Sequence, residues 1–113
     1  MSGSLWDWGL AEFRDRTASD APIPGGGSAA MVSAAIGLGL VLMALRVTAR
    51  KASDKTALTP LIDGGDRLLA ELSAHADADI AVFDAYMKAL KLPRGSEAEK
   101  AARRAAIADA AAA

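Results

Sequence analysis

Apolar residues dominate one long stretch of the chain, which has no charged residue between Asp20 and Arg46. From about Ala29 to about Arg50 the sequence is apolar on every side of a helix, and this predicts a helix buried in a bundle. A first helix is expected over residues 4–17, with Ser4 and Asp7 as a capping box. Its apolar side, expected to make core or interface contacts, carries Leu5, Trp6, Leu10 and Phe13.

A third helix is expected from Pro60 to about Leu90. At 100° per residue one face carries Leu61, Leu68, Leu72, Phe83, Tyr86 and Leu90. His75 and Asp79 fall on this face, whereas Asp77 falls elsewhere and is expected to be solvated. A carboxylate among apolar side chains is costly unless it is paired or its ionisation changes. Asp79 is therefore either an acid–base group or a structural ion-pair partner, and His75 either binds a ligand or is a hydrogen-bonded core histidine.

A complete capping box, Ser96-Glu97-Ala98-Glu99, predicts a fourth helix that ends near Ala111. The pattern shows no strands, so the expected fold is all-α: an antiparallel bundle of about four helices in a single domain over residues 1–113. Small residues recur at helical spacing in the long apolar helix, and such stripes suggest contact with another subunit. One stripe is Ala29, Ser33 and Gly37; the other is Ala35 and Gly39.

Charge and composition narrow the possible functions. The 13 basic and 14 acidic residues are scattered, so there is no basic face of the kind that binds nucleic acid. With no cysteine and one histidine, a disulfide framework, a thiolate metal site and a multi-histidine metal centre are excluded. The N-terminus has no basic region typical of a signal peptide, and the apolar helix lacks aromatic anchors of a membrane span. We therefore expect a soluble cytoplasmic protein.

The segment Pro22-Ile23-Pro24-Gly25-Gly26-Gly27-Ser28 precedes the apolar helix, and Ser28 is expected to be its N-cap. Two interpretations stay open. The segment is either a tight turn before a core helix, or a helix start whose backbone N–H groups bind an anionic or carbonyl-bearing ligand.

Several motifs, taken together and in order, resemble the cyclodeaminase/cyclohydrolase family of folate enzymes. They are Pro22-x-Pro24-Gly25-Gly26-Gly27-Ser28, Thr48-x-x-Lys51, Asp79-x-x-x-Phe83-Asp84-Ala85-x-Met87, Leu92-Pro93 and Glu97-x-Glu99-Lys100-Ala101-Ala102-Arg103. The resemblance implies an all-helical dimer that binds folate. It implies one of two reactions: hydrolysis of 5,10-methenyltetrahydrofolate to 10-formyltetrahydrofolate, or ring closure of 5-formimidoyltetrahydrofolate with release of ammonia. Hydrolysis is the favoured reaction. The alternative to both is a non-catalytic module that binds folate or another helical surface.

The resemblance also implies roles for particular residues. Asp79 and Lys51 are the implied catalytic residues. Asp79 would handle protons or stabilise the cationic amidinium carbon of the substrate, and Lys51 would bind the folate carboxylates or assist the reaction. The substrate-binding candidates are Pro24, Gly25, Gly26, Gly27, Ser28, Thr48 and His75. No metal and no cofactor beyond the tetrahydrofolate substrate are implied. Where members of this family often have glycine the chain has Arg50, and it lacks their further C-terminal helices, so we expect a fragment or a short member completed by a partner chain.

Overall fold

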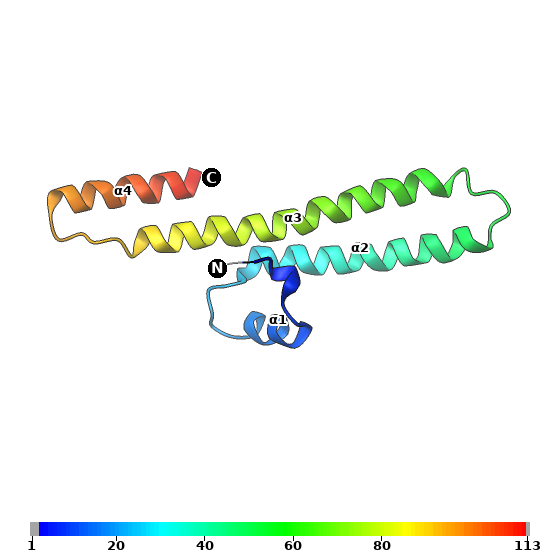
Figure 1. Ribbon diagram of the computed structural model, residues 1–113, viewed down its shortest axis with the longest axis horizontal. Helices are drawn as coiled ribbons and strands as arrows, with labels where there is room; N and C mark the ends of the chain where they lie inside the picture. Colours follow the sequence, from blue (N-terminus) through cyan, green and yellow to red (C-terminus); the bar gives the residue numbers. More distant parts are fainter. Residues whose placement is uncertain (1–2, 113) are drawn as a thin grey trace. The chain divides into compact units, whose positions relative to one another are not determined.

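The computed structural model describes residues 3–112, which form four α-helices and one 3-10 turn without a strand. In chain order these are η1 (Leu5–Asp7), α1 (Leu10–Thr17), α2 (Gly25–Lys51), α3 (Leu58–Leu90) and α4 (Glu97–Ala112) (Figure 1). The predicted all-α class is confirmed. The chain divides into two compact units, Met1–Asp77 and Ala78–Ala113, and α3 contributes to both.

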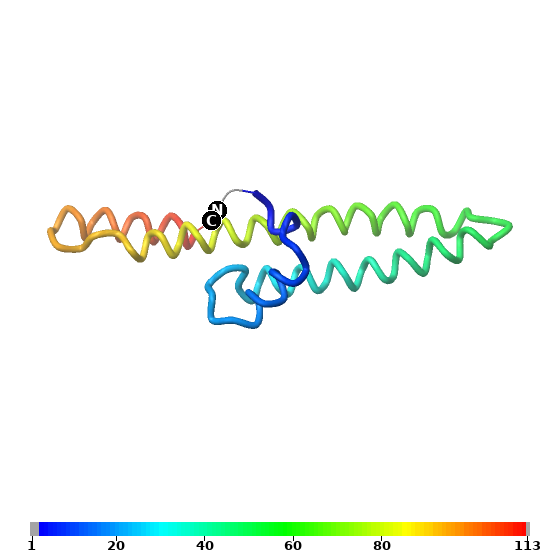
Figure 2. The backbone as a smooth tube through the Cα atoms, turned by 60° about the horizontal axis from the view of Figure 1, so that its bottom comes forward, coloured from blue at the N-terminus to red at the C-terminus, as the bar shows by residue number. Residues whose placement is uncertain are grey.

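In the first unit, α2 and the N-terminal part of α3 lie side by side as an antiparallel hairpin (Figures 1 and 2). The side chain of Leu42, only 2% exposed, packs against α3 at Gly65. A Cβ atom at Gly65 would lie 2.5 Å from Leu42 Cδ2, so the absence of a side chain there lets the two helices pack closely. Nearby, Arg46 pairs with Asp66, whose hydrogen bond and charge raise the pKa of the arginine above its usual value.

The start of α2 differs from the prediction. The helix begins at Gly25, not at Ala29, and its N-cap residue is the buried Pro24. Ser28 is therefore not an N-cap: it lies one turn into the helix, fully buried, and its hydroxyl donates a 2.7 Å hydrogen bond to the carbonyl oxygen of Ala76 on α3. This tertiary partner uses the hydroxyl that a cap would have required. The helix ends at Lys51, within one residue of the prediction.

The predicted single helix over residues 4–17 is wrong. The chain forms the 3-10 turn η1, passes through extended backbone at Trp8 and Gly9, and only then enters α1. Contacts with α3 explain the break. Asp77 accepts hydrogen bonds from Ser4 Oγ at 2.5 Å and from the backbone N–H of Leu5 at 2.8 Å. The expectation that Asp77 is a solvated charge is therefore also wrong.

The apolar helix α2 is only partly covered within the chain. It buries Val32, Ala35 and Leu42, but Ile36 and Leu40 are 57% and 59% exposed. Burial on all sides was expected, so this prediction fails for the chain taken alone. Of the described helices, α2 is long and apolar enough by length and composition to cross a membrane, a test that core helices of soluble proteins also pass.

The predicted apolar face of α3 is also exposed in the first unit, where Leu61 and Leu68 are 57% and 47% exposed. Gly65 and Ala76 occupy the side that meets α2 instead. Small residues of α3 suit this interface because the two helix backbones lie close together there, whereas Leu61 and Leu68 lie outside it. The length of the helix agrees with the prediction, since α3 begins at Leu58 and ends at Leu90.

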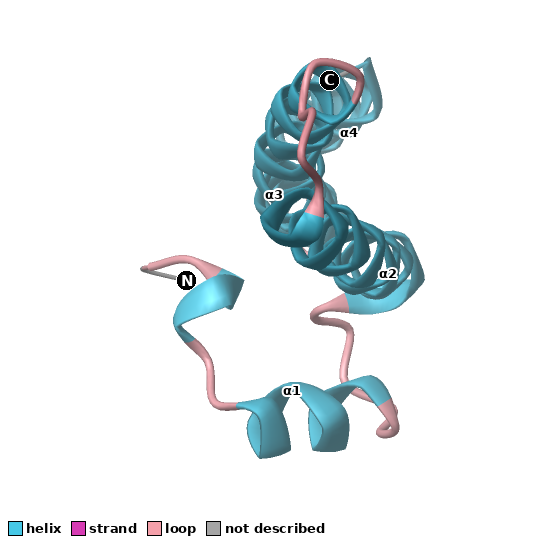
Figure 3. Cartoon of the chain, turned by 90° about the vertical axis from the view of Figure 1, so that its right-hand side faces the viewer, coloured by secondary structure: helices cyan, strands magenta, loops and turns pink. Residues whose placement is uncertain are grey.

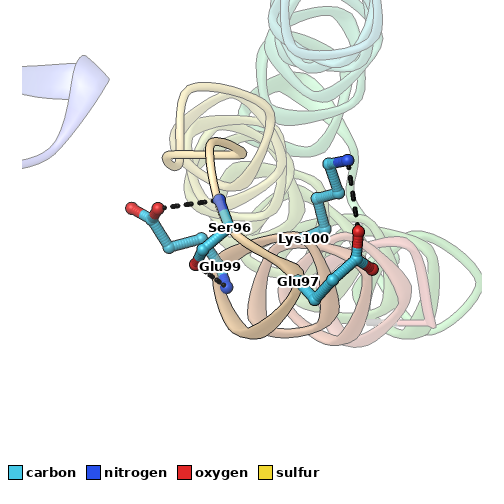
Figure 4. A network of polar contacts seen from close by, with 4 residues as sticks. All are labelled: Ser96, Glu97, Glu99 and Lys100. Atoms are coloured by element: carbon cyan, nitrogen blue, oxygen red, sulfur yellow. Dashed lines mark hydrogen bonds and ion pairs between the residues drawn. The ribbon is translucent and has the colours of Figure 1, made fainter.

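The second unit pairs the C-terminal part of α3 with α4. The predicted capping box is confirmed: Glu99 N–H donates to Ser96 Oγ at 3.1 Å, and Ser96 N–H donates to Glu99 Oε1 at 3.1 Å (Figure 4). Arg103, expected on a solvated face, is half-buried and donates from Nε to the carbonyl oxygen of Leu90 at 3.2 Å. This bond connects α4 to the C-terminal end of α3.

Candidate functional site

The predicted glycine turn forms the first turn of α2. The first N–H groups of an α-helix have no partner within the helix, and Pro24 has no side chain that could cap them. Gly25 has a φ of +76°, a conformation that favours glycine. Gly26 does not share this requirement, and a Cβ atom there would have no neighbour within 4 Å. The conformational need for glycine therefore lies at Gly25, and space for a ligand remains beside Gly26.

Thr48 and Lys51 lie at the opposite end of the same helix. Both are exposed, and the Thr48 hydroxyl donates to the carbonyl oxygen of Ala44 at 2.8 Å. Because a helix rises ~1.5 Å per residue, roughly 35 Å of α2 separate Gly25 from Thr48. Within one chain, the structure does not bring these two groups of predicted site residues together.

One turn of α3 holds both the N-terminal segment and the start of α2. The carbonyl oxygen of Ser73 accepts a 2.9 Å hydrogen bond from the indole Nε1 of Trp6, and the carbonyl oxygen of Ala76 accepts the bond from Ser28. The carboxylate of Asp77 accepts the bonds from Ser4 and from Leu5 at the start of η1. His75 lies in this turn but is exposed. Sequence reasoning missed Asp77, because its partners lie more than seventy residues away and no local pattern marks them.

An apolar cavity of about 420 Å³ lies between the N-terminal segment and α2. Figure 3, which looks along the α2–α3 hairpin, shows α1 lying across the view. The guanidinium of Arg16 lies 4.7 Å from the centre of the Trp8 ring, on the segment that forms one wall. The residues that line the cavity are Leu5, Trp6, Trp8, Leu10, Phe13, Val32, Ser33 and Ile36. These aromatic side chains are thus contacts within the first unit, and they leave room for a further apolar group.

Asp79 lies in the second unit and lines a separate cavity of about 400 Å³. The other residues of its lining are Val82, Phe83, Tyr86, Ala110 and Ala111. The helical period placed Asp79, Phe83 and Tyr86 on one face, and all three do line one cavity. The arrangement sets a half-buried carboxylate beside two aromatic rings and alanine methyl groups. Such a site can attract a cation or accept a proton from a bound water.

Several other charged side chains form surface ion pairs. Lys88 and Asp84 are 2.9 Å apart, and the hydrogen bond from Lys88 lowers the pKa of Asp84. Among residues 3–112 no three histidine, aspartate or glutamate side chains are grouped as metal ligands.

Comparison with known proteins identifies related sequences. The family described as Formiminotransferase-cyclodeaminase matches residues 9–113. The chain is 39% identical over 104 residues to a protein named methenyltetrahydrofolate cyclohydrolase from Methylorubrum extorquens, covering 89% of this chain and 50% of that protein. It is 35% identical to the formimidoyltransferase-cyclodeaminase of Sus scrofa, in a match that covers 87% of this chain and 19% of that protein. It is 33% identical to the formimidoyltransferase-cyclodeaminase of Mus musculus, in a match that covers 92% of this chain and 20% of that protein. The chain thus spans half the length of the first relative and about a fifth of the other two. No solved structure matches significantly.

Proposed function

This chain belongs to the formiminotransferase-cyclodeaminase family, and on that premise we propose that it hydrolyses 5,10-methenyltetrahydrofolate to 10-formyltetrahydrofolate. The observation that carries the proposal is the Asp79 cavity, in which a half-buried carboxylate lies beside aromatic and apolar side chains. The 39% identity to a relative named methenyltetrahydrofolate cyclohydrolase favours this reaction.

The proposed chemistry needs a proton acceptor and no cofactor beyond the tetrahydrofolate itself. The methenyl carbon of the substrate belongs to a positively charged amidinium group and is already electrophilic. Water adds to that carbon, and Asp79 takes one of its protons, which leaves a neutral carbinolamine. The bond from carbon to N5 then breaks with its electron pair going to N5. N5 receives the proton from Asp79, the carbinol oxygen loses its proton, and one proton is released overall.

The glycine turn and Lys51 serve binding in this proposal. The N–H groups at the start of α2 can donate to carbonyl or anionic groups of the folate, and the positive end of the helix dipole strengthens these bonds. Lys51, an exposed cation at the end of α2, suits the folate carboxylates. Thr48 and His75 are proposed as additional contacts to the substrate.

The second candidate reaction is ring closure of 5-formimidoyltetrahydrofolate with release of ammonia. It is favoured by the relatives named formimidoyltransferase-cyclodeaminase in two mammals. The same carboxylate would serve it, since the ammonia leaving group needs a proton. A chain that forms methenyltetrahydrofolate from the formimidoyl compound, and does not hydrolyse the methenyl compound, would establish this alternative.

We further propose that the chain works as a homodimer packed through α2. The exposed face of this helix carries Ile36, Leu40, Met43 and Val47, which recur at intervals of four, three and four residues. Beside them, Gly37 would have open space around an added Cβ, so another helix can approach closely there. An antiparallel second copy centred near Leu40 brings the Lys51 end of one α2 to the Gly25 end of the other. It would thus join the two groups of residues that one chain keeps apart.

Subunit mixing tests this dimer. We expect Gly25→Val and Lys51→Ala each to reduce activity strongly. When the two inactive proteins are mixed and allowed to exchange subunits, each heterodimer has one site with both changes and one with neither. A 1:1 mixture should therefore recover about a quarter of wild-type activity if subunits assort at random. Failure to recover activity, in samples shown to exchange subunits, would contradict a site shared in this way.

The reaction is tested by following the loss of methenyl absorbance under conditions in which spontaneous hydrolysis is slow. We expect protein-dependent loss, and a decrease of about 100-fold or more in Asp79→Asn, as for other general acid–base residues. Asp63→Asn is the matched control, because Asp63 is an exposed carboxylate on the same helix. Full activity in Asp79→Asn would refute the assigned role. Folate binding without turnover by the wild-type chain would indicate a binding module.

A further inference from the structure

The cavity beside Asp79 has the size and lining of a small-molecule site. Its volume of about 400 Å³ falls in the range of ligand pockets, ~300–1,000 Å³. Asp79, Phe83 and Tyr86 recur at i, i+4 and i+7, so one face of α3 presents all three. The alanine side chains contributed by α4 are too small to fill the space opposite that face.

The chemistry of this lining favours a planar cation. The faces of aromatic rings attract positive charge, and Arg, Lys or ligand cations bind them within ~6 Å. Asp79 adds an acidic side chain to the same lining, and an acidic group also favours a cation over a neutral ligand. A neutral flat ring would gain stacking with the aromatic side chains but would gain little from the carboxylate.

We propose that Phe83 and Tyr86, with Asp79, form a pocket that recognises a planar, charge-delocalised cation. This rests on the proposed function, in which the substrate is a methenyl amidinium ion and the formyl product has lost that charge. The pocket therefore holds the substrate more tightly than the product. Ring opening removes the positive charge and with it the attraction to the pocket, so the product leaves more easily. Phe83 and Tyr86 would thus contribute both to substrate selectivity and to product release.

Paired substitutions separate ring chemistry from packing. Phe83→Leu and Tyr86→Leu remove an aromatic ring, whereas Phe83→Tyr and Tyr86→Phe keep it. For each variant, KM for methenyltetrahydrofolate is compared with the product-inhibition constant for 10-formyltetrahydrofolate. We expect the leucine variants to raise KM about three- to tenfold and to change the inhibition constant less than about twofold. The ring-retaining variants should keep the wild-type ratio of the two constants.

Two results would overturn the proposal. One is an equal rise of both constants in the leucine variants, which would mean loss of general packing; the other is no change in either. Circular dichroism should show the same helix content in every variant compared. If the wild-type chain has no turnover, the proposed function fails, but the pocket is still tested by equilibrium binding. Wild-type protein that binds methenyltetrahydrofolate no more tightly than 10-formyltetrahydrofolate would then refute cation recognition.

Discussion

Gly65 is the position where a single methyl group tests the packing of α2 against α3. The change is Gly65→Ala, which would place a Cβ atom 2.5 Å from Leu42 Cδ2, 3.3 Å from Cγ and 3.7 Å from Cδ1. Leu42 is 2% exposed, so its side chain has little room in which to move away. Gly64→Ala is the matched control, since its Cβ would meet only the end of the Arg67 side chain, at 3.9 Å.

The expected magnitude follows from two opposing effects. Replacing glycine by alanine inside a helix stabilises it by about 1 kcal/mol, and this applies equally at both positions. Forcing an extra carbon into a packed core costs about 1–3 kcal/mol, and this applies only at Gly65. We therefore expect Gly64→Ala to raise the free energy of unfolding by up to about 1 kcal/mol. The free energy of unfolding of Gly65→Ala should be about 1–3 kcal/mol lower than that of Gly64→Ala.

The assay is urea unfolding followed by circular dichroism, with every variant at the same protein concentration because association would shift the midpoint. A double-mutant cycle with Leu42→Ala completes it. Leu42→Ala alone should destabilise by about 2–5 kcal/mol, and adding Gly65→Ala to it should cost less than in the wild type. Equal stability of Gly64→Ala and Gly65→Ala, or strict additivity in the cycle, would refute the close packing of Leu42 on α3.

Three further changes probe single contacts. Asp77→Asn should destabilise the chain by about 1–3 kcal/mol, because it weakens the two hydrogen bonds that Ser4 and Leu5 donate to this carboxylate. The tryptophan fluorescence should shift as η1 loosens. An unchanged spectrum and unchanged stability would contradict the role of Asp77 in holding η1 on α3. Ser96→Ala should lower the stability by about 0.5–2 kcal/mol, because it removes the hydrogen-bond acceptor of the Glu99 backbone N–H. An unaltered thermal unfolding curve would contradict the capping box at the start of α4. Lys88 lowers the pKa of Asp84, so their pair adds stability above the ordinary aspartate pKa and loses it as pH falls through the lowered value. Lys88→Ala should raise the Asp84 pKa in an NMR titration, and no shift would exclude the pair in solution.

Local sequence determined most of the secondary structure. The two ends of α3 and the start of α4 follow from Pro60, the break near Pro93 and the capping box at Ser96, all of which act within a few residues. The shared face of Asp79, Phe83 and Tyr86 follows from helical geometry alone. The ordered motifs also identified the family, because they preserve residue types and spacings along nearly the whole chain.

Tertiary structure decided what local pattern could not. Ser4 caps η1, because its Oγ accepts from the backbone N–H of Trp6, but the same hydroxyl also donates to Asp77 on α3. Ser28 resembles a cap in sequence, yet its hydroxyl donates to Ala76 on α3. No rule of local spacing encodes these α3 partners. Such contacts bend the N-terminal segment into η1 and α1. The spacing of apolar residues predicts that one face of a helix is apolar, but it does not determine which neighbouring element covers that face. For this reason Leu61, Leu68 and much of α2 were expected to be buried. In the folded chain α2 and α3 pack through Gly65, and these side chains stay exposed.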